Sequence, residues 1–278
     1  LSYLLTNKGG VRSEFTVYKV APQRYYLVSA GAYERHDHDY LKKAMPKDGS
    51  VSFERLTTSM GVLVLAGPRS RDVLAKLTDT DLSNEAFPWL TGKKMSIGVA
   101  PVDALRVNFI GELGWEIHHP IEMQNYIFDK LMEAGAAFDI KPFGIRAMTS
   151  MALEKSYKLL PRELSVEYSA YESGLDRFIS LKKPSFFGRE ALLAWKERGS
   201  ANHLVTMEVH NVTDADARGS EPIYQGDDIV GRVTSGGYGW RVGKSLALAM
   251  IRPDLAIEGA EFEIAILGSR HKATIIAD

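Results

Sequence analysis

The feature that most constrains the fold is a change of sequence pattern near residue 200. Beyond this point, short strand-like stretches recur at regular spacing, as in "EPIYQGDDIVGRVTSGGYG" and "EFEIAILGSRHKATII", with glycine and aspartate in the turns. Regularly spaced short strands are typical of small closed barrels. We therefore expect residues 201–278 to form an all-β barrel domain. Residues 186–200 are expected to form the helix that connects the barrel to the preceding chain, ending at Gly199.

The first two thirds of the chain mix strand and helix patterns. Residues 1–30 alternate strands with glycine and proline turns, and residues 121–138 and 144–157 have the 3.6-residue apolar period of amphipathic helices. Residues 100–109 and 114–120 have the pattern of a strand pair around a glycine-containing turn. The mixture predicts an α+β architecture for residues 1–185, without internal repeats.

Composition excludes several classes of protein. The 278 residues contain no cysteine, so disulfides, thiolate metal sites and a cysteine nucleophile are ruled out. The formal net charge is −1, which gives no general attraction to nucleic acid or to anionic membranes. No apolar run approaches the roughly 20 residues of a transmembrane helix. We expect neither nucleic acid nor a membrane among the partners, and a cytoplasmic location, in keeping with a reducing compartment.

Two motifs that suggest ligand binding fit poorly. In "SGGYGWRVGKS", a phosphate-binding loop needs a glycine where Tyr238 stands, so a glycine-rich β-turn is the better interpretation. Two pairs of histidines lack the spacing of a metal site: His36 with His38, and His118 with His119. We expect these histidines to be solvated at the surface and to bind no metal.

Two carboxylates at strand positions beside glycine turns are the more informative candidates. Glu14 follows Gly10 by four residues, and Glu116 stands between Trp115 and Ile117. The alternation of side chains along a strand places Glu116 on the face opposite Trp115 and Ile117. Considered singly, each is most simply a solvated carboxylate, because acidic residues are mostly exposed.

Seven motifs occur here in one order along the chain: "NKGGVRSEFTV", "LVSAGAYERHD", "LAGPRSRDVL", "RVNFIGELGWEIHHP", "GIRAMTSMALEKSY", "ELSVEYSAYESGLDRFI" and "TSGGYGWRVGKSLALAMI". Together they resemble the folate-binding aminomethyltransferase family, which includes the T-protein of the glycine cleavage system. The similarity is greatest to the branch fused to the C-terminal end of flavin-dependent dimethylglycine and sarcosine dehydrogenases.

The resemblance implies a three-domain cloverleaf around a central funnel, with the small β-barrel as its C-terminal domain. Residues 1–185 would hold two interleaved folate-binding domains. The first of these is expected to be incomplete, because the chain starts at Leu1 inside a strand that the family has well within its first domain. A flavin domain with FAD would lie further upstream.

The resemblance also assigns roles to residues. Glu116 corresponds to the carboxylate that holds the amino-pyrimidine edge of the pterin, and Glu14 to the catalytic acid, usually Asp. Val28 corresponds to a position that lines the folate pocket, and Phe109 to an aromatic that is usually Tyr. T-proteins carry an Arg-Asp pair and a second Arg on the helix of residues 144–157. Here Met148, Thr149 and Ala152 occupy their places, and Arg146 is a possible substitute.

These assignments predict a tetrahydrofolate-dependent one-carbon transferase that accepts an iminium derived from an N-methyl amine. If the source is eukaryotic, the mitochondrial matrix is the expected location. Two alternatives remain open. One is a stand-alone glycine cleavage aminomethyltransferase, and the other is a non-catalytic folate-binding module.

Overall fold

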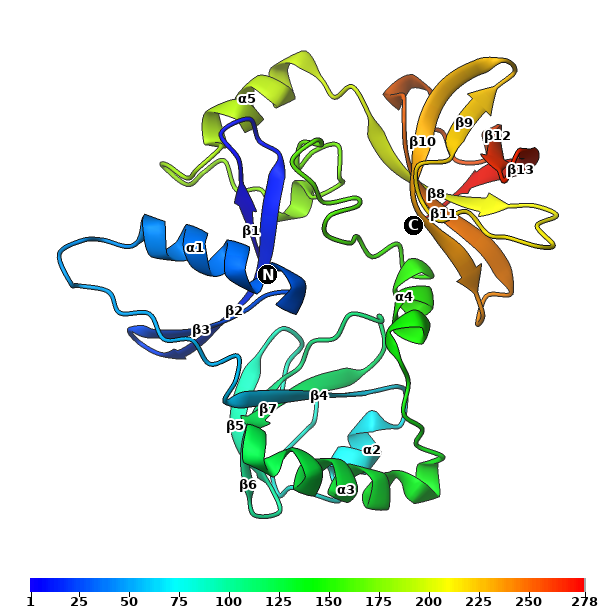
Figure 1. Cartoon of the computed structure of the whole chain (residues 1–278). Coiled ribbons are helices and arrows are strands. Elements are labelled where there is room, and N and C mark those ends of the chain that lie inside the picture. Colours follow the sequence, from blue (N-terminus) through cyan, green and yellow to red (C-terminus); the bar gives the residue numbers. More distant parts are fainter. Residues whose placement is uncertain (278) are drawn as a thin grey trace. The chain divides into compact units, whose positions relative to one another are not determined.

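A computed structural model describes residues 1–277, which fall into two compact units (Figure 1). Unit 1 comprises Leu1–Asp37 together with the chain from Thr149 onward, and unit 2 comprises His38–Met148. Helix α1 (Glu34–Ala44), after the short 3₁₀ turn η1 (Gly31–Tyr33), carries the chain out of the first segment of unit 1. The predicted domain limits at residues 185 and 200 stay a prediction.

Unit 1 begins with a three-stranded antiparallel sheet of β1 (Ser2–Leu5), β2 (Val11–Ala21) and β3 (Arg24–Val28). The turn between β1 and β2 is closed by Thr6, whose hydroxyl accepts a hydrogen bond from the Gly10 amide at 3.1 Å. A side chain at Gly10 has no room, because its Cβ would lie 2.5 Å from the Val166 carbonyl oxygen. This close contact explains why a glycine stands at the start of β2.

The C-terminal part of unit 1 is a closed barrel of six strands in the order β10-β11-β8-β13-β12-β9. The strands are β8 (His203–Val209), β9 (Pro222–Gln225), β10 (Asp228–Gly239), β11 (Lys244–Ile251), β12 (Glu261–Ile266) and β13 (Ser269–Ile276), with the 3₁₀ turn η5 (Pro253–Leu255) between β11 and β12. The predicted barrel is confirmed. The "SGGYGWRVGKS" motif lies on β10, a turn and β11, so the prediction of a glycine-rich turn between strands is also confirmed.

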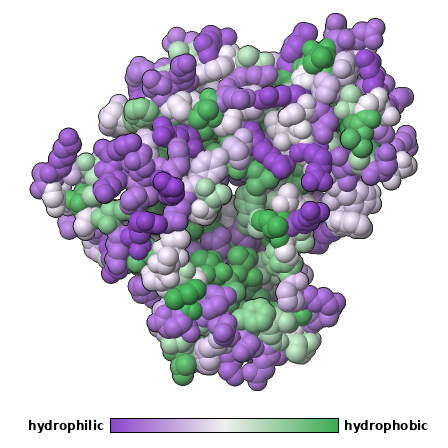
Figure 2. All heavy atoms as spheres, in the orientation of Figure 1, coloured by the Kyte–Doolittle hydropathy of each residue, from purple (hydrophilic) through white to green (hydrophobic). Residues whose placement is uncertain are grey.

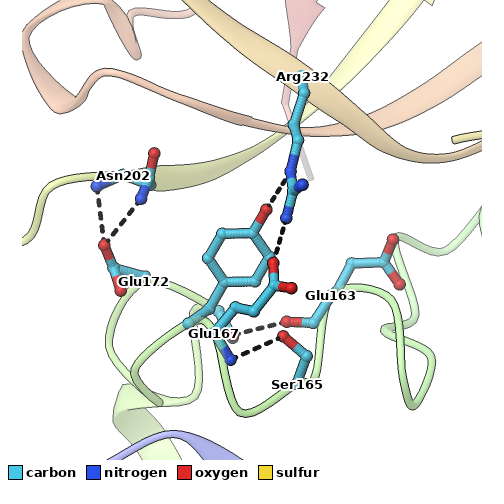
Figure 3. A network of polar contacts seen from close by, with 8 residues as sticks. Glu163, Ser165, Glu167, Glu172, Asn202 and Arg232 are labelled. Atoms are coloured by element: carbon cyan, nitrogen blue, oxygen red, sulfur yellow. Dashed lines mark hydrogen bonds and ion pairs between the residues drawn. The ribbon is translucent and has the colours of Figure 1, made fainter. Parts of the chain in front are cut away.

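Between the sheet and the barrel, unit 1 contains α4 (Ile145–Leu153), which starts four residues inside unit 2, then η4 (Asp176–Phe178) and α5 (Arg189–Arg198). Gly199 ends α5 with a φ of 82°, as predicted for a helix C-terminus. The chain between α4 and η4 is held to the barrel by polar contacts (Figure 3). Buried Glu163 accepts hydrogen bonds from the Leu159 amide and the Ser235 hydroxyl, and buried Glu172 accepts two from Asn202.

Unit 2 is a four-stranded antiparallel sheet in the order β4-β7-β6-β5. Its elements are β4 (Met60–Ala66), α2 (Ser70–Leu74), β5 (Gly92–Ile97), β6 (Ala100–Leu105), β7 (Gly114–Pro120), η2 (Ile121–Met123), α3 (Gln124–Gly135) and η3 (Ala136–Phe138). Trp115 and Ile117 of β7 pack with Ile127 and Leu131 of α3 in one buried core. The apolar side of α3 therefore covers one face of the sheet, and Glu116 and His118 lie on the opposite face.

Two details of unit 2 differ from the sequence-based expectations. The strand expected to reach residue 109 ends at Leu105, and β5 was not expected. At the start of α2, the Ser70 hydroxyl donates to the Leu113 carbonyl oxygen at 3.0 Å. Among residues 1–277, no helix is long and apolar enough to span a membrane.

Candidate functional site

The environment of Glu14 is set by the pairing of β1 with β2. Tyr3 lies directly opposite Glu14 in the register, and its hydroxyl donates a hydrogen bond to the Glu14 carboxylate. Burial raises the pKa of Glu14 above its ordinary value of 4.5, and the Tyr3 hydrogen bond opposes this shift. A carboxylate with a raised pKa is a stronger base, so Glu14 accepts a proton more readily than an exposed glutamate does.

Tyr3 is in turn held by residues of η4. The Phe178 ring meets the Tyr3 ring edge-on with their centroids 5.2 Å apart. Burial and the nearby Glu14 raise the pKa of Tyr3 above its ordinary value, while the positive charge of Arg177 opposes them. Tyr3 therefore keeps its proton at neutral pH and remains a hydrogen-bond donor. Our sequence reasoning missed Tyr3, although pairing the two strands through the turn at Thr6–Gly10 points to a residue of "SYLL" opposite Glu14.

Val28 lies at the end of β3, opposite Thr16 of β2. Thr16 and Glu14 are two residues apart on one strand, so their side chains share a face of the sheet. Unit 1 therefore places Glu14, Tyr3 and Val28 on one face. Val28 is half-buried there.

In unit 2, Glu116 occupies the sheet face opposite the core, as the alternation of side chains predicted. Trp115 and Ile117 are fully buried, whereas the Glu116 side chain retains 22% of its exposure. The His118 ring lies 3.3 Å from one Glu116 oxygen, measured from Nε2. Because a carboxylate has two oxygens with several acceptor positions, Glu116 can still accept hydrogen bonds from a ligand.

The prediction that His118 and His119 are solvated was wrong, because both side chains are completely buried. His118 pairs with Glu116, and His119 hydrogen-bonds the Ile117 carbonyl oxygen and the Gln124 side chain at 2.9 and 2.8 Å. Adjacent histidines on a strand point to opposite faces, so each needs its own partners when buried. No cluster of metal-binding side chains occurs among residues 1–277.

The turn before Glu116 is built by glycine and asparagine. Gly111 has a φ of 68°, and the Asn108 side chain donates to the Glu112 carbonyl oxygen and accepts from the Ile110 amide. At Gly114 a Cβ would lie 2.6 Å from the Leu65 carbonyl oxygen, so β7 can approach β4 only with glycine there. This contact sets the register that pairs Glu116 with Val64. The glycines that interrupt the strand pattern therefore determine the face on which Glu116 lies.

The remaining predicted site residues also lie in unit 2. Phe109 is half-buried in the same turn, and Arg146 is exposed in the first turn of α4. Of the residues that replace the family's Arg-Asp pair and second Arg, Met148 and Thr149 are half-buried and Ala152 is buried. Phe109 and Glu116 thus flank one turn, and Arg146 begins a separate helix.

The surroundings of Glu116 fit an aromatic ligand with hydrogen-bond donors at one edge. Val64 is the cross-strand neighbour of Glu116, Val62 is that of His118, and both valines keep more than 40% of their exposure. Figure 2 shows hydrophobic side chains gathered on unit 2 in the region of β4 and β7. An acidic acceptor beside apolar surface can hold a flat ring that carries hydrogen-bond donors at one edge.

Comparison with known proteins agrees with this architecture. Residues 1–183 match the GCVT N-terminal domain, and residues 202–278 match the glycine cleavage T-protein C-terminal barrel domain. The crystal structure of glycine cleavage system aminomethyltransferase T from Bartonella henselae has a similar fold, with a TM-score of 0.83 over 99% of this chain and 74% of that one at 21% identity. The chain belongs to the glycine cleavage T-protein family and has the aminomethyltransferase fold with its C-terminal barrel.

Relatives of two kinds are similar to the whole chain. Human mitochondrial dimethylglycine dehydrogenase is 36% identical over all of this chain and 32% of its own length, and mouse mitochondrial sarcosine dehydrogenase is 32% identical over 90% of this chain and 28% of its own length. The aminomethyltransferase of Thermoanaerobacter sp. is 30% identical over 99% of this chain and 74% of its own length. The chain thus spans about a third of the length of the dehydrogenases that it matches.

Proposed function

We propose that this chain transfers one-carbon units to tetrahydrofolate, as the folate domain of an enzyme similar to dimethylglycine and sarcosine dehydrogenases. The observation that carries the proposal is the half-buried Glu14 carboxylate, whose pKa is raised and which receives a hydrogen bond from Tyr3. Such a group would supply the base that amine chemistry needs. The whole-length similarity to dimethylglycine dehydrogenase supports an N-methyl amine as the source of the carbon, with FAD bound by an upstream domain.

Each residue has a part in this mechanism. Tetrahydrofolate, when bound, supplies the amines that take up the one-carbon unit from an iminium. In unit 2, the Glu116 carboxylate would accept hydrogen bonds from the pterin edge, beside Phe109. In unit 1, Val28 would offer the folate apolar surface on the sheet face that carries Glu14. Arg146 would provide a positive charge for an acidic part of the cofactor. The Glu14 carboxylate would accept the proton lost at the attacking amine, and Tyr3 would orient that carboxylate.

The role of Glu14 is tested by Glu14→Gln, which keeps the shape of the side chain and removes the base. We expect formation of methylene-tetrahydrofolate from dimethylglycine, measured in the enzyme with its flavin domain, to fall about 10²–10⁴-fold. Folate affinity should change little. Glu14→Asp, which restores the acid usual in the family, should retain activity. Turnover of Glu14→Gln at the wild-type rate would leave a non-catalytic folate-binding module as the better interpretation.

The stand-alone aminomethyltransferase is the second candidate, favoured by the 74% coverage of the Thermoanaerobacter relative. It differs in its donor, an aminomethyl group on a lipoyl carrier in place of an iminium from an N-methyl amine. Measuring methylene-tetrahydrofolate formation with each donor separates the two.

A further inference from the structure

A pocket of about 360 Å³ lies in unit 1, away from Glu14. It is bounded by the turn between β1 and β2, by α5 and by the segment of residues 166–169. Its volume is in the range of small-molecule sites. Gly10, which lines it, precedes Glu14 by four residues on β2, which corresponds to about 13 Å along a strand. The pocket is therefore separate from the carboxylate of the proposed reaction.

The pocket carries an excess of positive charge. Lys8 and Arg198 line it, and within residues 1–277 neither side chain forms an ion pair with a carboxylate. The one acidic residue of the lining, Glu167, is paired with Arg232 of the barrel (Figure 3). Arg232 is itself held in place by a 2.6 Å hydrogen bond to the Tyr168 hydroxyl. Since Glu167 already has a cation, Lys8 and Arg198 remain available to an anionic ligand.

The walls of the pocket are ordered before any ligand arrives. The Trp195 indole donates a 3.1 Å hydrogen bond to the Lys8 carbonyl oxygen, which ties α5 to the turn. The Arg198 guanidinium lies 3.8 Å from the centre of the Trp195 ring, so its plane is held by a cation–π contact. Val166 and Ala191 add apolar surface to the lining. A ligand would lose little free energy in ordering these groups.

We propose that this pocket binds a small organic anion, in which a carboxylate or phosphate contacts Lys8 and Arg198 and an apolar body lies against Val166 and Ala191. Arginine suits such groups because its planar guanidinium can donate two parallel hydrogen bonds. Two sources share this chemistry: a free metabolite, and the glutamate tail of folate itself. The distance from Glu14 along β2 favours the free anion.

Phenyl phosphate is a suitable probe, titrated by calorimetry into the whole chain at low salt. We expect saturable binding that weakens about 10-fold or more in Arg198→Gln and in Lys8→Gln, the usual loss for a hydrogen bond to a charged group. Lys196→Gln is the matched control, because Lys196 is exposed on the same helix and does not line the pocket. Circular dichroism of each variant verifies folding. Absence of binding at 10 mM, roughly the weakest affinity of a usable site, or equal loss in all three variants, overturns the proposal.

Two further measurements identify the chemistry and the source. Benzyl alcohol, which lacks the charge, should not bind, whereas binding equal to that of phenyl phosphate would contradict the anion site. Saturating tetrahydrofolate should leave phenyl phosphate binding unchanged. Competition between them would assign the pocket to the folate tail and overturn a separate site. None of these readouts depends on turnover, so they are independent of the proposed transferase activity.

Discussion

At the scale of single residues, the chemistry of this chain depends on where two carboxylates are placed. Both side chains are half-buried: Glu14 lies beside the Tyr3 phenol, and Glu116 lies beside the His118 imidazole. Burial makes the charged form of Glu14 less favourable and so prepares it to take a proton. Because Glu116 is partly exposed, its carboxylate can accept hydrogen bonds from donor groups of a ligand. The two environments therefore suit different tasks, proton transfer and recognition.

The raised pKa of Glu14 predicts a pH dependence of stability. The pKa of Glu14 in the folded state lies above its value in the unfolded chain, so the folded state holds the proton more tightly. The stability that this proton contributes to the folded state is complete below about pH 4.5. It is lost as the pH rises through the folded pKa. Glu14→Gln should therefore gain stability relative to wild type between about pH 4.5 and neutrality. Urea denaturation of both proteins across this range provides the test, and parallel pH profiles would contradict the burial of a charged Glu14.

Removing the Glu116 carboxylate should lower the affinity for tetrahydrofolate without disturbing the fold. Glu116→Ala should weaken tetrahydrofolate binding by about 1.5–3 kcal/mol, the usual worth of a hydrogen bond to a charged group. Calorimetry measures this. Asp103→Asn is a control from the neighbouring strand, since Asp103 pairs with His118 in the register but forms an ion pair with Lys94. Unchanged affinity in Glu116→Ala would remove Glu116 from the binding site.

At the scale of elements, the turn before β7 determines what the sheet of unit 2 presents. Gly114→Ala would place a methyl group 2.6 Å from the Leu65 carbonyl oxygen and 2.9 Å from the Ala66 Cα, so β4 would have to move. We expect a loss of about 1–3 kcal/mol in the free energy of unfolding, as for other overpacked sites. Gly144→Ala, where nothing lies within 4 Å, is the control and should change stability by less than about 0.5 kcal/mol. Equal effects in chemical denaturation would show that the close approach is relaxed.

At the scale of the molecule, unit 1 ties the segment between α4 and η4 to its barrel through the buried carboxyl groups of Glu163 and Glu172, which form no ion pair among residues 1–277. Glu163 is fully buried and contacts the Leu159 amide at 2.8 Å and the Ser235 hydroxyl at 2.5 Å. Glu163→Ala leaves both donors unsatisfied and should cost at least about 2 kcal/mol of stability. Glu167→Ala removes only an exposed ion pair with Arg232 and should cost less than about 1 kcal/mol. Similar costs in both variants would show that the buried contacts do not hold the barrel in place.

Local patterns in the sequence determined the elements of this protein. The strand spacing after residue 200 predicted the barrel, the apolar period of residues 121–138 predicted α3, and alternation along β7 placed Glu116 opposite Trp115. These features depend on neighbours within a few residues, which the sequence displays directly. The order of the seven motifs indicated the family and, through it, the candidate residues Glu14 and Glu116.

Only the tertiary structure decided what surrounds those residues. Tyr3 as the partner of Glu14, the burial of His118, and the meeting of Lys8 with Arg198 around one pocket depend on strand register and on contacts between distant segments. Register can slip by one residue without changing composition, and a slip moves every side chain to the other face. The pKa of a carboxylate follows from its burial and its partners, so the raised pKa of Glu14 emerges only when β1 and β2 pair.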